Sequence, residues 1–224
     1  MKTVLITGAS GGVGLSLANK LLNAGYFVIL HYFKNREKLE ILNQKYPNNS
    51  IIVQADLRSE EAVLQLVQFL DRKKLAIDVL VNNAGIDHVS EIEDKNVSTF
   101  VDVFLTNTVG PFLMMKYLCP TLKSHDGVII NISSDNTIDK FDPVTMEYDV
   151  SKVGLNMLTR EFAILYPDLK INALCFGWID SEMNNIPEDI KKELKMLTTD
   201  EAADRIIESF ETKESGKIEL VREK

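Results

Sequence analysis

The chain has 224 residues, 45% of them apolar and 26% charged, which is typical of one globular domain with a sizeable core. No apolar run approaches the roughly eighteen residues of a membrane span, and a formal charge of −8 argues against nucleic acid or an anionic membrane as a partner. The opening residues show no signal-peptide pattern, so we expect a soluble, cytoplasmic protein.

Strand-like and helical patterns alternate along the chain. Short apolar runs predict strands at 3–7, 27–31, 51–55, 79–81, 128–132, 170–175 and 218–221. Segments of helical period predict helices at 13–24, 36–45, 59–73, 99–123, 145–165 and 199–212. Strands of near-continuous Val, Ile and Leu are buried on both faces, as in a parallel sheet between two helical layers. The pattern therefore predicts an α/β fold, a doubly wound parallel seven-stranded sheet of the Rossmann type, in a single domain over 1–224.

A glycine-rich turn follows the first strand and leads directly into the first helix. Glycines let the backbone approach a ligand, and a helix N-terminus supplies unpaired N–H groups and positive potential. A tight turn alone would need only one glycine, whereas this segment has four in seven positions. We therefore predict a nucleotide phosphate site formed by Gly8, Ser10, Gly11, Gly12, Val13 and Gly14.

Cysteine and histidine spacing gives no sign of a metal site. The two cysteines, Cys119 and Cys175, lie far apart in apolar surroundings, which favours two buried reduced thiols over a disulfide. The three histidines have no ligand spacing, so no metal is predicted.

Further motifs follow the glycine-rich turn in a fixed order. They are Asp56-Leu57, Asn82-Asn83-Ala84-Gly85, Asn107, Asn131-Ile132-Ser133-Ser134, Tyr148-x-x-x-Lys152 and Gly177-x-Ile179-x-Ser181-x-Met183. Together with the opening Thr-Gly-x-x-x-Gly-x-Gly, this series resembles the short-chain dehydrogenase/reductase family, and within it the 3-oxoacyl-(acyl carrier protein) reductase branch. The resemblance covers nearly the whole chain. It implies an oxidoreductase that transfers a hydride between NADP(H) or NAD(H) and a carbonyl or alcohol substrate.

The Tyr-x-x-x-Lys pattern occurs twice, and only one occurrence has helical geometry. In the second, Tyr166 precedes a proline, which biases it out of the helical region, so that segment predicts a helix exit into a strand. Tyr148 and Lys152 lie in a segment of helical period without proline, which puts them one turn apart on one face. We therefore take Tyr148 and Lys152 as the functional pair.

Tyr148 can act as a base near neutrality only if its anion is stabilised. A phenol with a pKa near 10 needs about 3 to 4 kcal/mol, and an ammonium about 5 Å away at an effective dielectric near 20 supplies roughly 3 kcal/mol. We expect Lys152 to lower the pKa of Tyr148 in this way, helped by a cationic nicotinamide ring and Ser134. The alternative is that Tyr148 is a half-buried aromatic that anchors its helix.

The resemblance implies a role for each catalytic candidate. Tyr148 exchanges a proton with the substrate oxygen, Lys152 also binds the nicotinamide ribose, and Ser134 holds the oxygen as its charge develops. Asn107 positions a water in a proton relay behind Lys152. For Ser133 the simpler interpretation is a hydroxyl that satisfies backbone at the strand end.

The remaining candidates are expected to bind the cofactor. Asn83, Ala84 and Gly85 form a turn beside the nucleotide, Asp56 and Leu57 lie at the adenine, and Gly177, Ile179 and Ser181 lie at the nicotinamide. An alternative for Asp56 is capping of the helix near Ser59. The end of the second strand carries Lys34 and Arg36 and no acid before Glu37, which favours NADP(H) over NAD(H). Alternatively, both cations are solvated charges at a helix start.

Substrate recognition is expected in the region 178–213, which is predicted to hold a short lid and the C-terminal helix and is shorter than the family's usual arrangement. Phe176 stands where the family usually has proline. The loop that enters the helix of Tyr148 is polar. Tyr148 is surrounded in the sequence by six acidic or amide residues, with only Lys140 positive: Asp135, Asn136, Asp139, Asp142, Glu147 and Asp149. If this loop faces the pocket rather than solvent, it disfavours anionic substrates and an acidic carrier protein.

We therefore expect a carbonyl reductase or alcohol dehydrogenase for a small or medium-sized neutral molecule. One alternative is reduction of 3-oxoacyl groups on acyl carrier protein in fatty acid synthesis. Another, from a different class, is a catalytically idle nucleotide-binding sensor or scaffold. An epimerase or dehydratase of nucleotide sugars is disfavoured because no extra substrate domain is present. The resemblance further implies a homodimer or homotetramer through the helices at 99–123 and 145–165.

Overall fold

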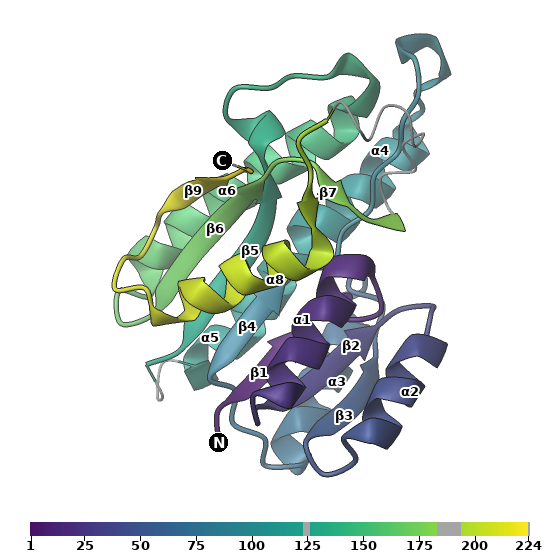
Figure 1. Cartoon of the computed structure of the whole chain (residues 1–224). Coiled ribbons are helices and arrows are strands. Elements are labelled where there is room, and N and C mark those ends of the chain that lie inside the picture. Colours follow the sequence, from purple (N-terminus) through teal and green to yellow (C-terminus); the bar gives the residue numbers. More distant parts are fainter. Residues whose placement is uncertain (123–125, 183–193, 224) are drawn as a thin grey trace.

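The structure, a computed structural model, describes residues 1–122, 126–182 and 194–223. Its centre is one parallel sheet with the strand order β3-β2-β1-β4-β5-β6-β9 (Figure 1). The strands are β1 (Thr3–Ile6), β2 (Phe27–Tyr32), β3 (Ser50–Gln54), β4 (Val79–Asn82), β5 (Val128–Ser134), β6 (Lys170–Phe176) and β9 (Ile218–Val221). The predicted doubly wound, seven-stranded fold is confirmed.

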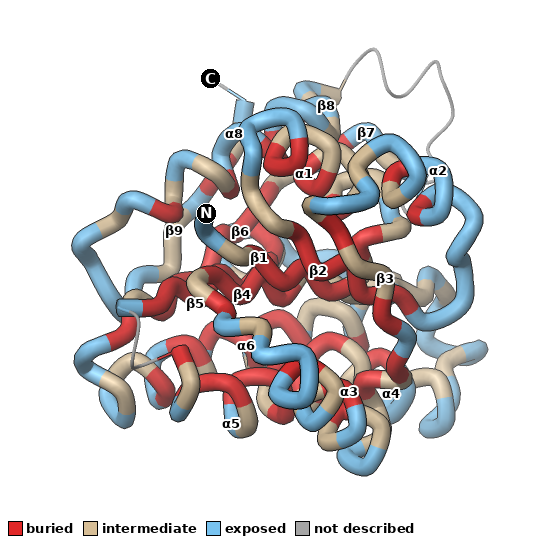
Figure 2. Tube along the Cα trace, turned by 90° about the horizontal axis from the view of Figure 1, so that it is seen from below, coloured by how far each residue is buried: buried red, intermediate tan, exposed pale blue. Residues whose placement is uncertain are grey.

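Helices cover both faces of the sheet (Figure 2). Against one face lie α1 (Gly12–Asn23), α2 (Glu37–Lys45) and α8 (Thr199–Glu208), and against the other lie α3 (Glu60–Arg72), α4 (Val97–Phe104), α5 (Gly110–Leu122) and α6 (Met146–Leu165). Strand alternation divides the core between the two layers. In β1, Val4 and Ile6 pack with α1, whereas Leu5 packs with α3 and α5.

The functional motifs meet because of this topology. The chain leaves β1 in one direction to build β2 and β3 and returns to pair β4 with the other side of β1. In sheets of this kind a ligand crevice opens at the carboxyl ends of the strands on either side of that switch point. The strands β1, β4, β5 and β6 all end at that edge, and the segments that follow them carry the predicted motifs.

One predicted helix is divided in the structure. The stretch 99–123 contains α4, a π-helical segment (Leu105–Val109) and α5. Pro111 has no N–H to donate to the carbonyl of Asn107, which favours the wider turn at this place. The last helix is also shorter than predicted, because α8 ends at Glu208 and continues as a 3-10 turn (Ser209–Glu211).

Smaller elements also surround the main sheet. Two short strands, β7 (Ile179–Asp180) and β8 (Leu197–Thr198), pair in parallel and were not predicted. Single 3-10 turns occupy Ile92–Asp94, Asp135–Thr137 and Pro143–Thr145. Residues 183–193 of the predicted lid, including Met183, lie outside the described residues.

Within the described residues, one helical stretch passes the length and composition test for a membrane span, Val97–Leu122. The core helix of a globular protein passes the same test. In this stretch α5 contributes Leu113, Met114 and Leu118 to the core beneath the sheet. We therefore interpret it as a core helix.

Candidate active site

A cleft of about 910 Å³ opens at the carboxyl edge of the sheet. Most of the predicted site residues line it: Gly8, Ser10, Gly11, Gly12, Val13, Gly14, Lys34, Asp56, Leu57, Asn83, Ala84, Gly85, Ser134, Tyr148, Lys152, Gly177, Ile179 and Ser181. Asn107 lies buried behind the wall, and Arg36 lies outside the lining, where it pairs with Glu40 at 2.9 Å.

The glycine-rich turn has the geometry of a phosphate-binding turn. Gly8 adopts φ +65°, and a Cβ there would lie 2.8 Å from the Cα of Ala84. A Cβ on Gly14 would lie 2.4 Å from the carbonyl oxygen of Gly8, so only glycine lets α1 pack this closely on the turn. The N-cap of α1 is Gly11, no side chain accepts from the first turn, and no acid lies in it. The helix N-terminus is therefore available to an anion.

Residues after β4 fasten the glycine-rich turn to the sheet. The Asn83 side chain donates to the carbonyl oxygens of Thr7 and Gly8 at 2.9 and 3.1 Å. In return the Thr7 hydroxyl accepts from the backbone N–H groups of Asn83 and Ala84, both at 3.0 Å. These bonds make the turn after β1 and the turn after β4 one rigid wall of the cleft.

His31 also supports the glycine-rich turn, and sequence reasoning missed it. The Gly8 N–H donates to His31 Nδ1 at 3.2 Å, so Nε2 carries the proton and donates to the carbonyl of Ala55 at 3.1 Å. Complete burial lowers the pKa of His31 to about 4, which keeps the ring neutral. The signal in the sequence was weak, because a histidine inside an apolar strand usually has a packing role.

The end of β2 and the start of α3 form a charged, aromatic corner of the cleft. The Arg58 guanidinium donates to both oxygens of Asp56 and to Asp102 at 3.1 Å, and its carbon lies 5.3 Å from the centre of the Phe33 ring. The hydrogen bonds from Arg58 hold the pKa of Asp56 below its usual value. The α3 cap is Ser59, so the alternative role of Asp56 as that cap is wrong. Lys34 lies beside the same ring, 5.4 Å from its centre.

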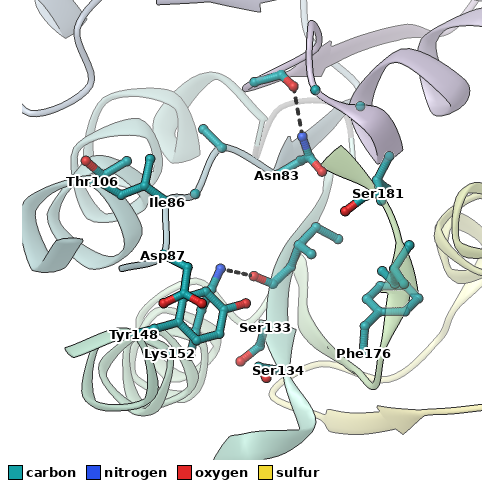
Figure 3. A pocket seen from close by; sticks show the side chains of 18 of the residues that line it. Asn83, Ile86, Asp87, Thr106, Ser133, Ser134, Tyr148, Lys152, Phe176 and Ser181 are labelled. Carbon is teal, nitrogen blue, oxygen red and sulfur yellow. Dashed lines mark hydrogen bonds between the residues drawn. The ribbon is translucent and has the colours of Figure 1, made fainter. Parts of the chain in front are cut away.

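The Tyr148 and Lys152 side chains lie one turn apart on α6 and face the cleft (Figure 3). Lys152 Nζ donates to the carbonyl of Ile132 at 2.7 Å and lies 5.4 Å from the centre of the Tyr148 ring. The other pattern behaves as predicted, because Tyr166 ends α6 and Lys170 begins β6.

Burial dominates the electrostatics of this pair. It lowers the pKa of Lys152 to about 8 and raises the pKa of Tyr148, which the Asp87 carboxylate raises further and a hydrogen bond with Ser134 lowers. The pKa of Tyr148 is thus shifted opposite to our expectation. The reason is physical: the Lys152 ammonium is directed at the Ile132 carbonyl, and desolvation of the phenol outweighs it.

Asn107 fixes the segment between β4 and the substrate side of the cleft. Its side-chain oxygen accepts from the N–H of Ile86 and its amide donates to the carbonyl of the same residue, both at 2.8 Å. The amide also donates to the Ser151 hydroxyl at 3.0 Å. Asn107 is fully buried in the π-helical segment, a local distortion that is frequent at functional sites.

Ser133 and Ser134 end β5 at the floor of the cleft (Figure 3). The Ser134 hydroxyl accepts from the N–H of Asn136 at 3.2 Å. The Ser133 hydroxyl is buried and has no hydrogen-bond partner among the described residues, so the simpler interpretation of Ser133 is wrong.

On the opposite wall of the cleft, Gly12 leaves space for Ser181, since a Cβ on Gly12 would lie 3.2 Å from the Cβ of Ser181.

Cations pair with two of the carboxylates in the loop before Tyr148. Arg222, just after β9, donates to Asp135 at 2.8 Å and to Asp139 at 3.0 Å, and Lys140 pairs with Asp135 at 3.1 Å. A side chain on Gly177 would meet both Arg222 and Asp135 within 3.3 Å. The structure therefore adds a second cation, Arg222, to the Lys140 that the sequence places in this loop.

Glu147 is also neutralised from outside the loop. It is 1% exposed, and its carboxylate accepts from Lys95 at 2.5 Å and contacts His88 Nδ1 at 3.3 Å. Lys95 also donates to the carbonyl of Val144 at 2.9 Å. Burial alone would raise the pKa of Glu147, but the hydrogen bond from Lys95 holds it below its usual value.

Metal ligands do not gather in the part of the chain that the structure describes, where no group of three His, Cys, Asp or Glu side chains could hold an ion. Both cysteines are buried and free. The two reduced thiols are therefore confirmed.

The fold and the cleft define a Rossmann-type dinucleotide-binding protein. A family model described as short chain dehydrogenase matches residues 2–191. The chain belongs to the short-chain dehydrogenase/reductase family, and it is an NAD(P)-dependent oxidoreductase.

Characterised and uncharacterised relatives support this placement. An uncharacterized oxidoreductase of Thermotoga maritima is 33% identical over 189 residues, which cover 81% of this chain and 73% of that protein. The 3-oxoacyl-(acyl-carrier-protein) reductase FabG of Staphylococcus aureus is 31% identical over 204 residues, which cover 88% of this chain and 82% of that protein. Among solved structures, ElxO with NADP bound is 27% identical with a TM-score of 0.87, over 98% of this chain and 96% of that chain.

Proposed function

We propose that this chain interconverts a carbonyl and an alcohol on a small or medium-sized molecule without negative charge, with Tyr148 as the general acid and base. One observation carries the proposal: Ser134, Tyr148 and Lys152 line the same cleft as the glycine-rich turn. The intact trio weighs against the idle sensor or scaffold.

The turn after β1 fits a dinucleotide phosphate, because the uncapped first turn of α1 offers N–H groups without an acid nearby. Gly8, Ser10, Gly11, Gly12, Val13 and Gly14 would hold the phosphates, Asp56 and Leu57 the adenine, Asn83, Ala84 and Gly85 the ribose side, and Gly177, Ile179 and Ser181 the nicotinamide. When bound, the nicotinamide supplies or accepts the hydride.

The catalytic residues then divide the proton chemistry. Burial keeps the Tyr148 phenol protonated, which is the form that donates to a carbonyl oxygen. Ser134 holds that oxygen while charge develops on it. The Lys152 ammonium compensates the phenolate that remains, and a pKa near 8 lets it pass a proton on near neutrality. Asn107 joins the backbone of Ile86 to Ser151 of α6 behind this pair, and it is proposed to position the relay water.

We infer that NADP(H) is preferred to NAD(H). Lys34 lines the cleft at the end of β2, and the nearby Asp56 carboxylate is paired with Arg58, which weakens its repulsion of a 2′-phosphate. The solved relative ElxO has NADP bound. Arg36 contributes less than Lys34 in this proposal, since it is engaged with Glu40 outside the lining.

The substrate side is proposed to lie at 178–213 and at the loop before Tyr148. Similarity to FabG gives weak support to acyl carrier protein substrates, and the cleft offers such a carrier few free cations: Lys140, Arg222 and Lys95 are each paired with carboxylates. A homodimer or homotetramer is proposed through α4 and α6, whose outer faces expose Val101, Val153 and Met157.

The proposal is tested by screening carbonyls and alcohols with NADPH and NADH, using Tyr148→Phe as the control. The variant should lose at least about a hundredfold in kcat/KM while it retains cofactor affinity, because only the proton donor is removed. Wild-type kcat/KM should be higher with NADPH. Turnover that survives in Tyr148→Phe contradicts the proton role, and a preference for NADH contradicts the cofactor assignment.

A further inference from the structure

Asp87 places a carboxylate on the substrate side of the cleft. It follows Ile86, whose backbone is fixed by Asn107, and it lines the cavity. Figure 3 shows Asp87 at the same wall as Tyr148 and Lys152. Its charge acts on both, since it is the largest electrostatic influence on the pKa of Tyr148 and also raises that of Lys152. The carboxylate therefore lies near the atoms that react.

Among the described residues, Asp87 forms no ion pair, although Lys95 and Lys152 act on it from farther away. One oxygen of Asp87 accepts from the N–H of His88 at 2.7 Å, and no Lys or Arg of the described chain forms an ion pair with it. The neighbouring acids differ: Asp135 is paired with Lys140 and Arg222, and Glu147 with Lys95. Burial accordingly raises the pKa of Asp87. An unpaired, partly desolvated carboxylate is costly, and such groups are concentrated at sites that bind a ligand.

The cleft provides the other features that a cation requires. Phe141, Phe176 and Trp178 line it, and aromatic faces attract ammonium groups. An anion would be repelled by Asp87, whereas an ammonium would form a charge-assisted hydrogen bond with its free oxygen. We propose that Asp87 is a specificity-determining residue that selects carbonyl or alcohol substrates bearing an ammonium group. This inference rests on the function proposed above.

A bound ammonium would also assist the chemistry. By cancelling the field of the Asp87 carboxylate at the phenol, it removes the electrostatic influence that most disfavours the Tyr148 anion. A substrate with an ammonium group would therefore lower the pKa of Tyr148, whereas a neutral isostere would not. Selection by Asp87 should therefore appear in kcat as well as in KM.

The test uses three matched ketones: a dimethylamino ketone, its carbon isostere in which CH replaces the protonated nitrogen, and the keto acid of the same length. Each is measured with wild type, Asp87→Asn and Glu93→Gln. Glu93 is the control because it is an exposed carboxylate on the same segment and does not line the cleft. Affinities of the three ligands for the NADP⁺-loaded chain, which has no hydride to transfer to a ketone, are measured by calorimetry and accompany the kinetics.

Wild type should prefer the amino ketone to its isostere by about tenfold or more in kcat/KM and in affinity, as expected for one close charge pair. Asp87→Asn should reduce that ratio to near one and improve the keto acid, while Glu93→Gln leaves both unchanged. Equal ratios in wild type and Asp87→Asn overturn the proposal. So does a loss of NADP⁺ affinity in Asp87→Asn with the ketone ratio unchanged, which would assign the carboxylate to the cofactor.

Absence of turnover for all three ketones would contradict the proposed function. The role of Asp87 in binding would then be tested by the calorimetric affinities alone. In that case a preference for the ammonium ligand that Asp87→Asn abolishes supports the role of Asp87. Equal affinity of wild type for the ammonium ligand and its isostere contradicts it.

Discussion

Single residues in the cleft are governed by burial more than by their charged neighbours. Tyr148, Lys152 and His31 are all shifted by desolvation toward their neutral forms. The motif spacing in the sequence was enough to find Tyr148 and Lys152, because it depends on one helical turn. It could not give the direction of the Tyr148 shift, since desolvation depends on residues from β5, β6 and the segment after β4.

His31 should make stability depend on pH below neutrality. Its pKa is about 4 in the folded chain and 6.5 in the unfolded chain, so the unfolded state binds the proton first. Stability should therefore be complete above pH 6.5 and fall as the pH decreases toward 4, by about 3 kcal/mol from this residue. His31→Gln should flatten this dependence. Urea unfolding of both proteins across that range measures it, and identical slopes would contradict the assignment.

At the scale of elements, buried contacts between distant segments hold the cleft together. The segment after β4 is joined to the start of α6 by Lys95 and Glu147, and the loop after β5 is joined to β9 by Arg222. The sequence predicted the strands and helices within a few residues, because their apolar periodicity is local. It did not predict these ion pairs, because partners far apart in sequence leave no local pattern. It also did not predict the π-helical segment before Pro111.

Lys95→Met should destabilise the fold by about 3 to 5 kcal/mol, because it leaves the Glu147 carboxylate buried without a cation. The loss should be smaller in the double variant Lys95→Met with Glu147→Met, where no charge remains buried. Chemical denaturation of the wild type, both single variants and the double variant gives the coupling. Additive losses would show that the two side chains do not act as a pair.

At the scale of the whole molecule, the strand order explains why motifs spread over the chain form one site. Alternating apolar strands and helices were sufficient to predict the sheet, since parallel strands need crossovers of one hand. The small sheet of β7 and β8 was not predictable, because each strand has only two residues. Glycine and asparagine motifs indicated the half of the cleft where we propose the cofactor, whereas the half where we propose the substrate, which includes Asp87, carried no motif.

The proposed association through α4 and α6 predicts a change in mass on substitution. Val153→Glu places a charge on the exposed face of α6 and should shift the sedimentation coefficient toward that of a monomer, with secondary structure retained. Ile41→Glu, an exposed apolar residue on α2, is the matched control and should leave the mass unchanged. A monomeric wild type would contradict the proposed assembly.

The contact of Arg222 with Asp135 and Asp139 has a consequence for the order of synthesis. The glycine-rich turn, Tyr148 and Lys152 are all made before residue 218, whereas Arg222, which neutralises Asp135 together with Lys140, comes only after β9. Until Arg222 has been made, Lys140 is the cation of this pair that is available to the Asp135 carboxylate. The charge balance of the loop after β5 is therefore completed only when Arg222 has been synthesised and β9 has paired with β6.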